Sequence, residues 1–124
     1  MNTKVVVTEI TIESITTKNL LIEVIGQLDE VNIENVAKIF YDTIDKSGEK
    51  VNFLIDFKNL DFINSKGIGY LLDFFRKISE KNGKMVISNP SENVLDILEL
   101  VGVTKVLKVF LSLEEAKLAL RQGI

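Results

Sequence analysis

The residues best suited to chemistry stand together in the segment INSKGIG, residues 63–69. Ser65 offers one hydroxyl, Lys66 offers one ammonium group, and Gly67 and Gly69 leave the backbone behind them uncovered. An apolar helical pattern begins here, so we expect Ser65 to be the helix N-cap, with its hydroxyl accepting a hydrogen bond from a first-turn amide. Because a helix N-terminus presents free amides and a partial positive charge, a phosphate would be favoured at this junction.

Two plainer interpretations of this segment remain open. In one, Ser65 is only a helix cap, whose removal would cost about 1 kcal/mol of stability. In the other, the glycines carry no ligand, since GIG is shorter than a dinucleotide-binding fingerprint and the segment lacks the lysine-serine ending of a phosphate-binding loop. Residue types and spacing therefore indicate a helix start that tolerates a phosphate, and no more than that.

Hydrophobic periodicity predicts the elements that position this junction. Apolar runs and alternations indicate strands over residues 4–15, 20–26, 51–57, 84–88 and 106–110, the first two joined antiparallel by the short turn TTKN. Helical spacing indicates helices from a cap at Asn32 to Gly48, over residues 66–81, from a cap at Ser91 to Gly102, and after a cap at Ser112. Strands that alternate with helices form parallel sheets, so we predict a single α/β domain over residues 1–124, with a mostly parallel, mixed sheet, an antiparallel N-terminal strand and four helices.

The helix expected over residues 66–81 has one buried and one exposed face. Its buried stripe is predicted to contain Ile68, Leu71, Leu72, Phe75 and Ile78. Tyr70 lies off that stripe, with Phe74 at its margin and with Asp73 and Lys77 nearby. We expect a partner to bind this flank together with the Ser65 segment and the loop QLDE at 27–30. In the alternative interpretation, Phe74 is a peripheral core residue and Tyr70 a lone surface aromatic.

Composition excludes several kinds of site. The chain has 124 residues and a net charge of −3, with interspersed charges and with no cysteine or histidine. Disulfides, thiolate metal sites and histidine bases are therefore excluded, and no basic stripe indicates a nucleic-acid partner. No signal-peptide pattern or membrane-length apolar run is present, so a cytoplasmic location is the default expectation. We expect no cofactor, no metal and no membrane contact.

An enzyme is one alternative function. Asp29, Asp56 and Asp61 supply carboxylates, but no histidine or cysteine accompanies them, and Asp56 is expected within a strand rather than at its tip. A carboxylate pair at glycosidase-like spacing stays open. A phosphoryl-receiver domain would need an acidic pair after the first strand, and ESITTKN provides none. We therefore expect no catalytic residues.

Four motifs follow one another along the chain. They are GQLD at 26–29, LIDFKNLDFINSKGIGYLL at 54–72, NGKMVISNPSENV at 82–94 and LELVGVTKVLKVFLSLEEA at 98–116. In their order and spacing they resemble the STAS domain family, in particular its stand-alone bacterial anti-sigma factor antagonists. The resemblance runs nearly from end to end of the chain.

The resemblance implies a protein that works by being bound. In this family the unphosphorylated antagonist captures a serine kinase that is also an anti-sigma factor, and phosphorylation releases it. Ser65 falls on the phosphorylated serine of the family, and Asp29 on an acidic residue beside it. Asn64 replaces the family's aspartate, and Lys66 its second serine or threonine. Both replacements favour a phosphate electrostatically, and both change what a kinase would recognise.

The resemblance also implies which residues meet the partner. With phosphorylation at Ser65, the expected partner-binding residues are Asp29, Asn64, Lys66, Gly67, Gly69, Tyr70 and Asp73. The expected partners are an anti-sigma factor/serine protein kinase and a phosphatase. The oligomeric state is open, because the N-terminal strand could be a free sheet edge. The alternative is a nucleotide-binding or transporter-regulating STAS domain that is not phosphorylated, with a GTP or ATP phosphate at residues 66–69.

Overall fold

The computed structural model describes residues 3–124. Its strands are β1 (Lys4–Ile10), β2 (Asn19–Leu28), β3 (Asn52–Asp56), β4 (Leu60–Ile63), β5 (Lys84–Ser88) and β6 (Lys108–Phe110). Its helices are α1 (Ile33–Ser47), α2 (Ser65–Glu80), α3 (Glu92–Val101) and α4 (Leu113–Arg121), with a short 3-10 helix, η1 (Val103–Lys105), before β6. The predicted order of elements is confirmed, with one strand, β4, added to it.

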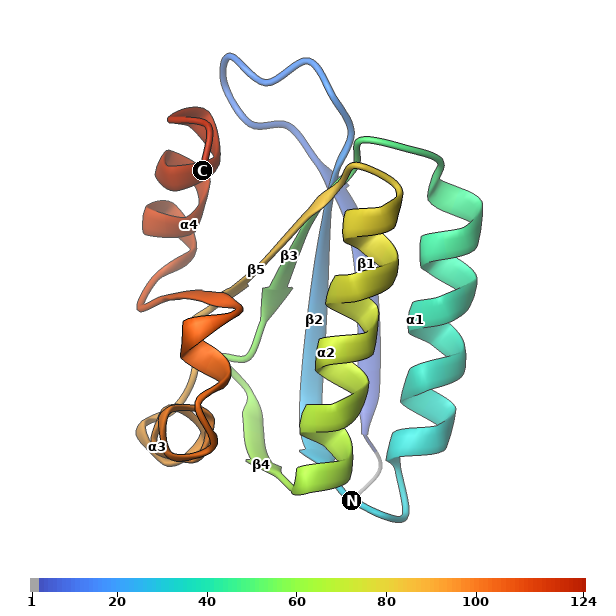
Figure 1. Cartoon of the computed structure of the whole chain (residues 1–124), viewed down its shortest axis with the longest axis vertical. Coiled ribbons are helices and arrows are strands. Elements are labelled where there is room, and N and C mark those ends of the chain that lie inside the picture. The colour runs from blue at the N-terminus through green and yellow to red at the C-terminus, as the bar shows by residue number, and fades with distance from the viewer. Residues whose placement is uncertain (1–2) are drawn as a thin grey trace.

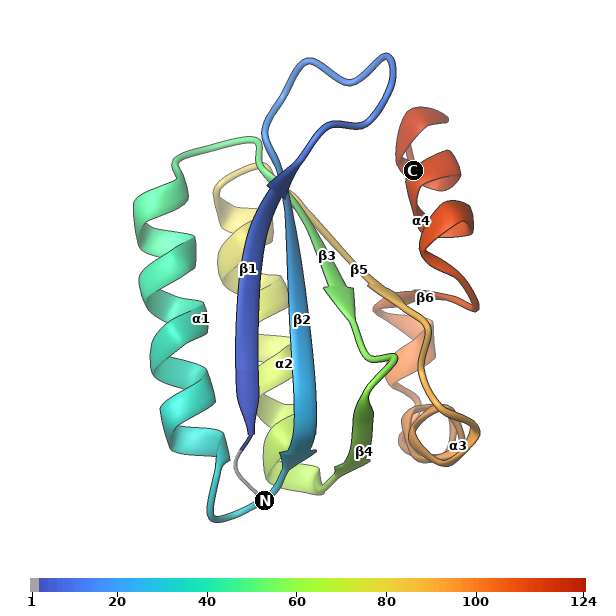
Figure 2. The same cartoon turned by 180° about the vertical axis from the view of Figure 1, so that it is seen from behind.

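The sheet is mixed, as predicted. β1 pairs antiparallel with β2, and β2, β3, β5 and β6 follow as parallel neighbours (Figure 1; β6 is labelled in Figure 2). β2 is long enough to serve two partners, because its first half pairs with β3 and its last residues pair with β4. The register shifts after Gly26, whose φ of +113° suits glycine better than any other residue. β4 leads directly into α2, so this irregular pairing sets the position of the α2 N-terminus.

Several predicted boundaries were wrong. The first strand ends at Ile10 rather than at residue 15, and a long loop replaces the expected short turn. Ile12 is apolar because it is buried beside α4, and not because the strand continues. The last strand is Lys108–Phe110 rather than 106–110. The segment between β3 and α2, expected to be a loop, contains β4, which is too short to show a period of its own.

Two apolar layers cover the sheet on opposite faces. α1 and α2 lie side by side on one face and build the larger core against β2, β3 and β5 (Figures 1 and 2). α4 covers the other face through a smaller cluster that includes Leu54, Val86 and Leu120. α3 packs near β4, where the side-chain amide of Asn93 donates to the backbone oxygen of Asp61 at 3.3 Å. Along the chain, β3 is followed by β4, β4 leads into α2, and β5 leads into α3. The starts of α2 and α3 therefore both follow the carboxyl ends of parallel strands.

The buried stripe of α2 differs from the prediction at two positions. Ile68, Leu71 and Ile78 are buried as expected, but Leu72 is 37% exposed and Phe75 is only half-buried. Phe74 is 1% exposed and stacks on Phe40 of α1, with the ring centroids 4.4 Å apart. The stripe is turned toward α1 because α2 is packed against a second helix as well as against the sheet. Phe74 is a core residue.

None of the helices in residues 3–124 has the length and apolarity to cross a membrane. The longest of them, α2, has 16 residues and carries several charged side chains along its solvent side.

Candidate functional site

The site is organised around the first turn of α2. The amide of Asn64 donates to the backbone oxygen of Leu28 at 3.0 Å, which continues the β4–β2 ladder up to the helix. The side-chain oxygen of Asn64 then accepts from the amide of Gly67 at 2.9 Å, so Asn64 is the N-cap. The expectation that Ser65 caps the helix was wrong. Ser65 is the first helical residue; it is exposed, and its hydroxyl makes no hydrogen bond within residues 3–124.

Gly67 and Gly69 differ in the space that surrounds their Cα atoms. A Cβ on Gly67 would lie 2.9 Å from Cγ1 of Ile63 and 3.1 Å from the backbone oxygen of Leu28. Gly67 therefore lets α2 approach the ends of β2 and β4, which confirms the predicted close backbone contact. A Cβ on Gly69 would meet nothing within 4 Å. Gly69 instead leaves a small open depression bordered by Tyr41, Lys66 and Tyr70 among others.

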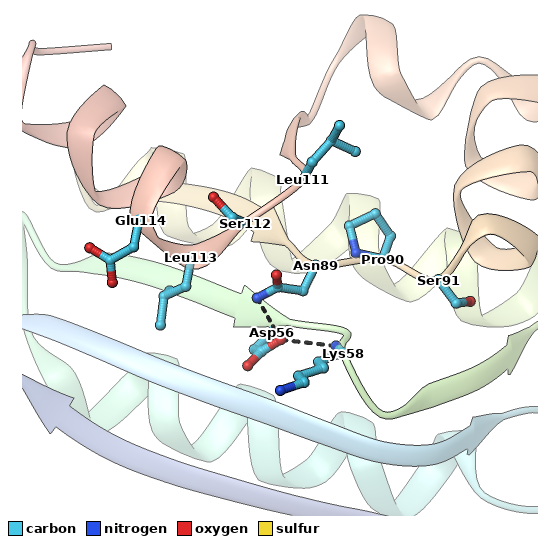
Figure 3. Close-up of a pocket in the computed structure, with 9 residues that line it drawn as sticks. All are labelled: Asp56, Lys58, Asn89, Pro90, Ser91, Leu111, Ser112, Leu113 and Glu114. Carbon is cyan, nitrogen blue, oxygen red and sulfur yellow. Dashed lines mark hydrogen bonds between the residues drawn. The ribbon is translucent and has the colours of Figure 1, made fainter.

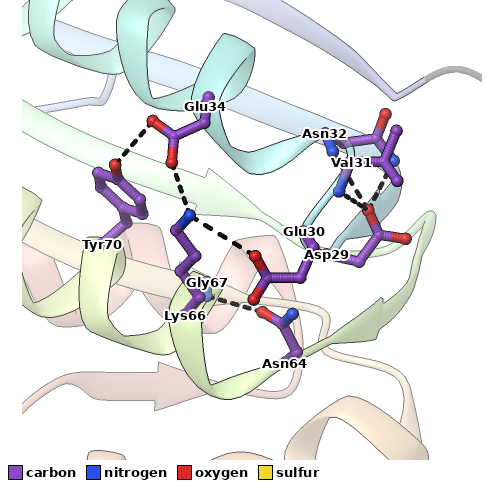
Figure 4. A network of polar contacts seen from close by, with 9 residues as sticks. All are labelled: Asp29, Glu30, Val31, Asn32, Glu34, Asn64, Lys66, Gly67 and Tyr70. Carbon is purple, nitrogen blue, oxygen red and sulfur yellow. Dashed lines mark hydrogen bonds and ion pairs between the residues drawn. The ribbon is translucent and has the colours of Figure 1, made fainter.

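Asp29 organises the neighbouring turn between β2 and α1. One of its carboxylate oxygens accepts from the amide of Val31 at 3.0 Å, and from both the amide and the side chain of Asn32 at 3.2 and 3.1 Å (Figure 4). Asn32 stands at the N-cap position, but its side chain donates to Asp29 and caps nothing, contrary to prediction. Leu28 is paired with Ile63, so Asp29 and Asn64 follow adjacent strand ends. The structure thus brings Asp29 into the region of Ser65.

Lys66 is held by two carboxylates from the opposite side of the site. Its Nζ lies 2.8 Å from Oε1 of Glu34 and 3.6 Å from Oε2 of Glu30, while the hydroxyl of Tyr70 donates to Oε2 of Glu34 at 3.0 Å (Figure 4). We call this set of residues, Glu30, Glu34, Lys66 and Tyr70, the lysine clasp. It joins the first turn of α2 to the start of α1. The charged groups of the clasp are exposed, so the clasp orients these side chains more than it stabilises the fold.

The hydrogen bonds of the clasp shift the protonation equilibria of its members. The bond from Lys66, followed by that from Tyr70, lowers the pKa of Glu34. The bond to Glu34 raises the pKa of Lys66 and also that of Tyr70. Sequence reasoning did not identify Glu34 as a site residue. The sequence contains no clear signal for it, because Glu30 lies in the turn before α1 and no helical period links it to Glu34.

Aromatic side chains extend the site along the seam between α1 and α2. Tyr70 is half-buried and packs edge-on against Tyr41, with the ring centroids 6.3 Å apart, so it is not a lone surface aromatic. The hydroxyl of Tyr41 donates to Asp73, which also pairs with Arg76 at 2.7 Å. Burial first, and then this bond, raise the pKa of Tyr41, while the bonds from Tyr41 and then Arg76 lower the pKa of Asp73. Lys77 lies 5.5 Å above the Tyr41 ring. Tyr41 is a further residue that the sequence did not single out.

The predicted site residues gather around the first turns of α2, although Gly67 is buried and so offers no surface to a partner. Lys66, Gly69, Tyr70 and Asp73 lie along the α2 side of the seam, and Asn64 and Gly67 build the helix start beneath Ser65. Asp29 stands at the adjoining strand end. Within residues 3–124 no group of three or more Asp and Glu side chains is placed to hold a metal ion. The chemistry available is that of an exposed hydroxyl that can accept a group, in a setting rich in carboxylates.

The fold and this helix start together define a STAS-type α/β domain. A family model described as "STAS domain" matches residues 10–116, and the chain belongs to this family. The resemblance to the anti-sigma factor antagonists within it is also confirmed. An anti-sigma F factor antagonist of Paenibacillus polymyxa is 23% identical over 91 residues, which cover 73% of this chain and 77% of that protein.

Solved structures agree with this assignment at the level of the fold. The anti-sigma factor antagonist SpoIIAA in its unphosphorylated form superimposes with a TM-score of 0.71 at 22% identity, covering 96% of this chain and 99% of that one. The phosphorylated form of the Bacillus cell fate determinant SpoIIAA gives a TM-score of 0.62 at 21% identity, covering 93% and 99% of the two chains.

Proposed function

We propose that this chain is an anti-sigma factor antagonist that binds an anti-sigma factor with serine kinase activity, and that phosphorylation of Ser65 weakens this binding. The observation that carries the proposal is the exposed hydroxyl of Ser65 at the first position of α2, where the fold makes no use of it. The named function of the relatives supports the choice of partner. We place the protein in the cytoplasm, where sigma factors act, and include a phosphatase that restores the unmodified form.

The helix start is suited to carry a phosphate without loss of the fold. The cap is made by Asn64, so modifying the Ser65 hydroxyl removes no hydrogen bond from it. A phosphate at the N-terminal end of a helix is also favoured by the helix dipole and by unpaired first-turn amides. Ser65 is exposed, so the phosphate stays in water. Phosphorylation is therefore expected to change the surface while the domain remains folded.

The same phosphate would oppose a docked partner. It adds about −1.5 to −2 charges to a helix start where the neighbouring side chain, Lys66, already faces Glu30 and Glu34. Lys66, the nearest cation, already pairs with Glu34 and Glu30, so a phosphate would have to compete for it. A partner packed over Ser65 would bury an uncompensated double charge, which costs several kcal/mol. A cost of about 3 kcal/mol would lower the affinity roughly a hundredfold.

These carboxylates also argue against a nucleotide at residues 66–69. A nucleotide phosphate would meet the same acidic surroundings, and Lys66 would have to leave Glu34 to bind it. The partner-binding proposal needs no such exchange in the unmodified state. Amide NMR titration with GTP and ATP separates the two proposals, because the partner-binding proposal expects no saturable shifts at residues 66–69.

The test uses the purified chain and the anti-sigma factor kinase encoded in the same genome. Incubation with ATP followed by mass spectrometry should show one phosphate, on Ser65. Calorimetry should then show tight binding of the unmodified chain and of Ser65→Ala, and roughly hundredfold weaker binding of the phosphorylated chain and of Ser65→Asp.

Ser79→Asp is the matched control, since Ser79 is exposed on the same helix at its opposite end. It should bind as the unmodified chain does. Phosphate on a different residue, or equal affinity of the modified and unmodified chains, would refute the proposed switch.

A further inference from the structure

We propose that a second site, a groove at the carboxyl ends of β3, β5 and β6, binds a neutral polyhydroxylated molecule through its vicinal hydroxyls (Figure 3). The groove has a volume of about 520 Å³ and lies between the segments that start α3 and α4. It shares no residue with the lysine clasp or with the first turn of α2. The site is therefore independent of the partner-binding surface proposed above.

Asp56 supplies the observation that points to a ligand. It lies within β3, as expected, but as the last residue of that strand, so the expectation that it is not at the tip was wrong. Its Oδ1 accepts from the amide of Lys58 at 2.9 Å and from the side chain of Asn89 at 3.4 Å (Figure 3). Its Oδ2 has no donor within residues 3–124, although the residue lines the groove and is only 8% exposed. A carboxylate oxygen in such a position favours a donor from outside.

Ser88 lies next to Asp56 in the sheet, beneath the groove. It pairs with Asp56 on one side and with Phe110 on the other, so the three residues form one row across the sheet. Side chains in such a row point to the same face of the sheet. The Ser88 hydroxyl is fully buried and has no hydrogen-bond partner in the described part of the chain. Ser88 does not line the groove, so its hydroxyl cannot contact a ligand there, and Asp56 alone offers the groove an oxygen that these residues leave without a donor.

The charges around the groove select a neutral ligand. Asp56 and Glu114 would repel an anion, even though α3 and α4 both begin here. Lys58 and the positive ends of those two helices would repel a cation. A hydroxyl group satisfies both sets of groups, because it donates to the Asp56 oxygen and accepts from an ammonium or an amide. Two neighbouring hydroxyls can meet the carboxylate and the ammonium at once.

The remaining walls fit the body of a sugar ring. Ser91 and Ser112 cap α3 and α4 by accepting from the amides of Val94 and Glu115, which leaves both hydroxyl hydrogens free to donate. Pro90 and Leu113 add apolar surface that can pack on the carbon face of a ring. The ligand class is therefore a small molecule with a vicinal diol, either a free sugar or the ribose of a nucleoside.

Amide NMR of the full chain, titrated separately with D-ribose, D-glucose and adenosine, tests the proposal. We expect saturable shifts centred on Lys58, Asn89 and Leu113, with dissociation constants in the millimolar range. Binding of both sugars and adenosine would identify a general diol site, and binding of adenosine alone a nucleoside site. 2′,3′-Dideoxyadenosine, which lacks the diol, should cause no shifts in this region.

Asp56→Asn should weaken binding about tenfold, since a hydrogen bond to a charged acceptor is replaced by one to a neutral acceptor. Lys58→Met, at an exposed position that cannot affect the core, should also weaken it, and Asp61→Asn is the control that should not. Kinase binding by Asp56→Asn should equal that of the parent chain, so this proposal and the proposed function fail separately. Absence of saturable shifts with all three compounds, or unchanged affinity in both Asp56→Asn and Lys58→Met, would show that water alone fills the groove.

Discussion

Gly67 and Gly69 are two residues apart in the first turns of α2, yet the structure predicts opposite effects for the same substitution at each. A Cβ at Gly67 would lie 2.9 Å from Cγ1 of Ile63, and 3.1 and 3.2 Å from the backbone oxygen and Cβ of Leu28. Two of these three atoms cannot move without disturbing β2, and the third belongs to a side chain that is itself buried. Gly67→Ala therefore overpacks the junction of β2, β4 and α2.

The magnitudes follow from two opposing effects. Replacing glycine by alanine within a helix gains about 0.5–1 kcal/mol of stability, because the unfolded chain loses conformational freedom. Overpacking a close contact costs about 1–3 kcal/mol. Gly69→Ala has only the gain, since nothing lies within 4 Å of the new methyl group. We expect Gly69→Ala to raise the free energy of unfolding by about 0.5–1 kcal/mol, and Gly67→Ala to lower it by about 1–2 kcal/mol.

Urea unfolding followed by circular dichroism measures both variants against the parent chain. The two variants differ by the same single methyl group, so each is the control for the other. Equal unfolding midpoints for Gly67→Ala and Gly69→Ala would refute the argument from close approach. Gly69→Ala also fills the depression beside Tyr70 without destabilising the fold. Reduced kinase affinity in this variant would therefore locate the partner at the α1–α2 seam.

Three further predictions concern the cap, the core and the clasp. Asn64→Ala should lower the free energy of unfolding by about 1 kcal/mol while Ser65→Ala changes it by less than about 0.5 kcal/mol, and equal losses in urea unfolding would mean that the cap is shared. Phe74→Ala should cost about 3–5 kcal/mol in the same measurement, and a loss below about 1 kcal/mol would contradict its place in the core. The pKa of the Glu34 carboxyl, measured by NMR, should lie below its ordinary value of 4.5 and should rise toward that value in Lys66→Met. Because this pKa is lowered in the folded chain, the pair stabilises the parent chain at neutral pH, and this small stabilisation is lost as the pH falls through the lowered pKa. An unchanged Glu34 pKa in Lys66→Met would mean that the pair does not form in solution.

The strands and helices could be predicted because each long element repeats its own pattern. α1 buries Ile33, Val36, Ala37, Phe40 and Ile44, the residues that a helical period selects from the sequence. β4 could not be found in this way, because four residues are too few to show a period and because its pairing depends on the last residues of β2. The sequence also did not reveal that Phe74, rather than Phe75, is the buried aromatic residue of α2. It depends on Phe40, a residue of another helix, and a single helix pattern contains no information about its neighbour.

Within the site, the sequence identified the residues more successfully than their hydrogen bonds. Ser65, Lys66 and the two glycines were recognised as a helix start, and the resemblance to a known family added Asp29. The cap was placed one residue too late, because asparagine and serine are both good N-caps and the chain has them side by side. The clasp was missed because Glu34 meets Lys66 only when α1 packs beside α2. Contacts between elements are the part that sequence patterns leave undetermined.

The order Asn64-Ser65 has a consequence for any switch at this position. If the serine were the cap, its oxygen would serve both the fold and the kinase, and a phosphate on it would disturb the bond to the first-turn amide. With Asn64 as the cap, that bond at 2.9 Å does not involve the oxygen that would be modified. The domain then has nearly the same stability in both states, and the free energy of the added charge is expressed at the partner interface rather than in unfolding. Equal urea midpoints for the phosphorylated and unmodified chains, together with unequal kinase affinities, are the pair of results that this division of roles requires.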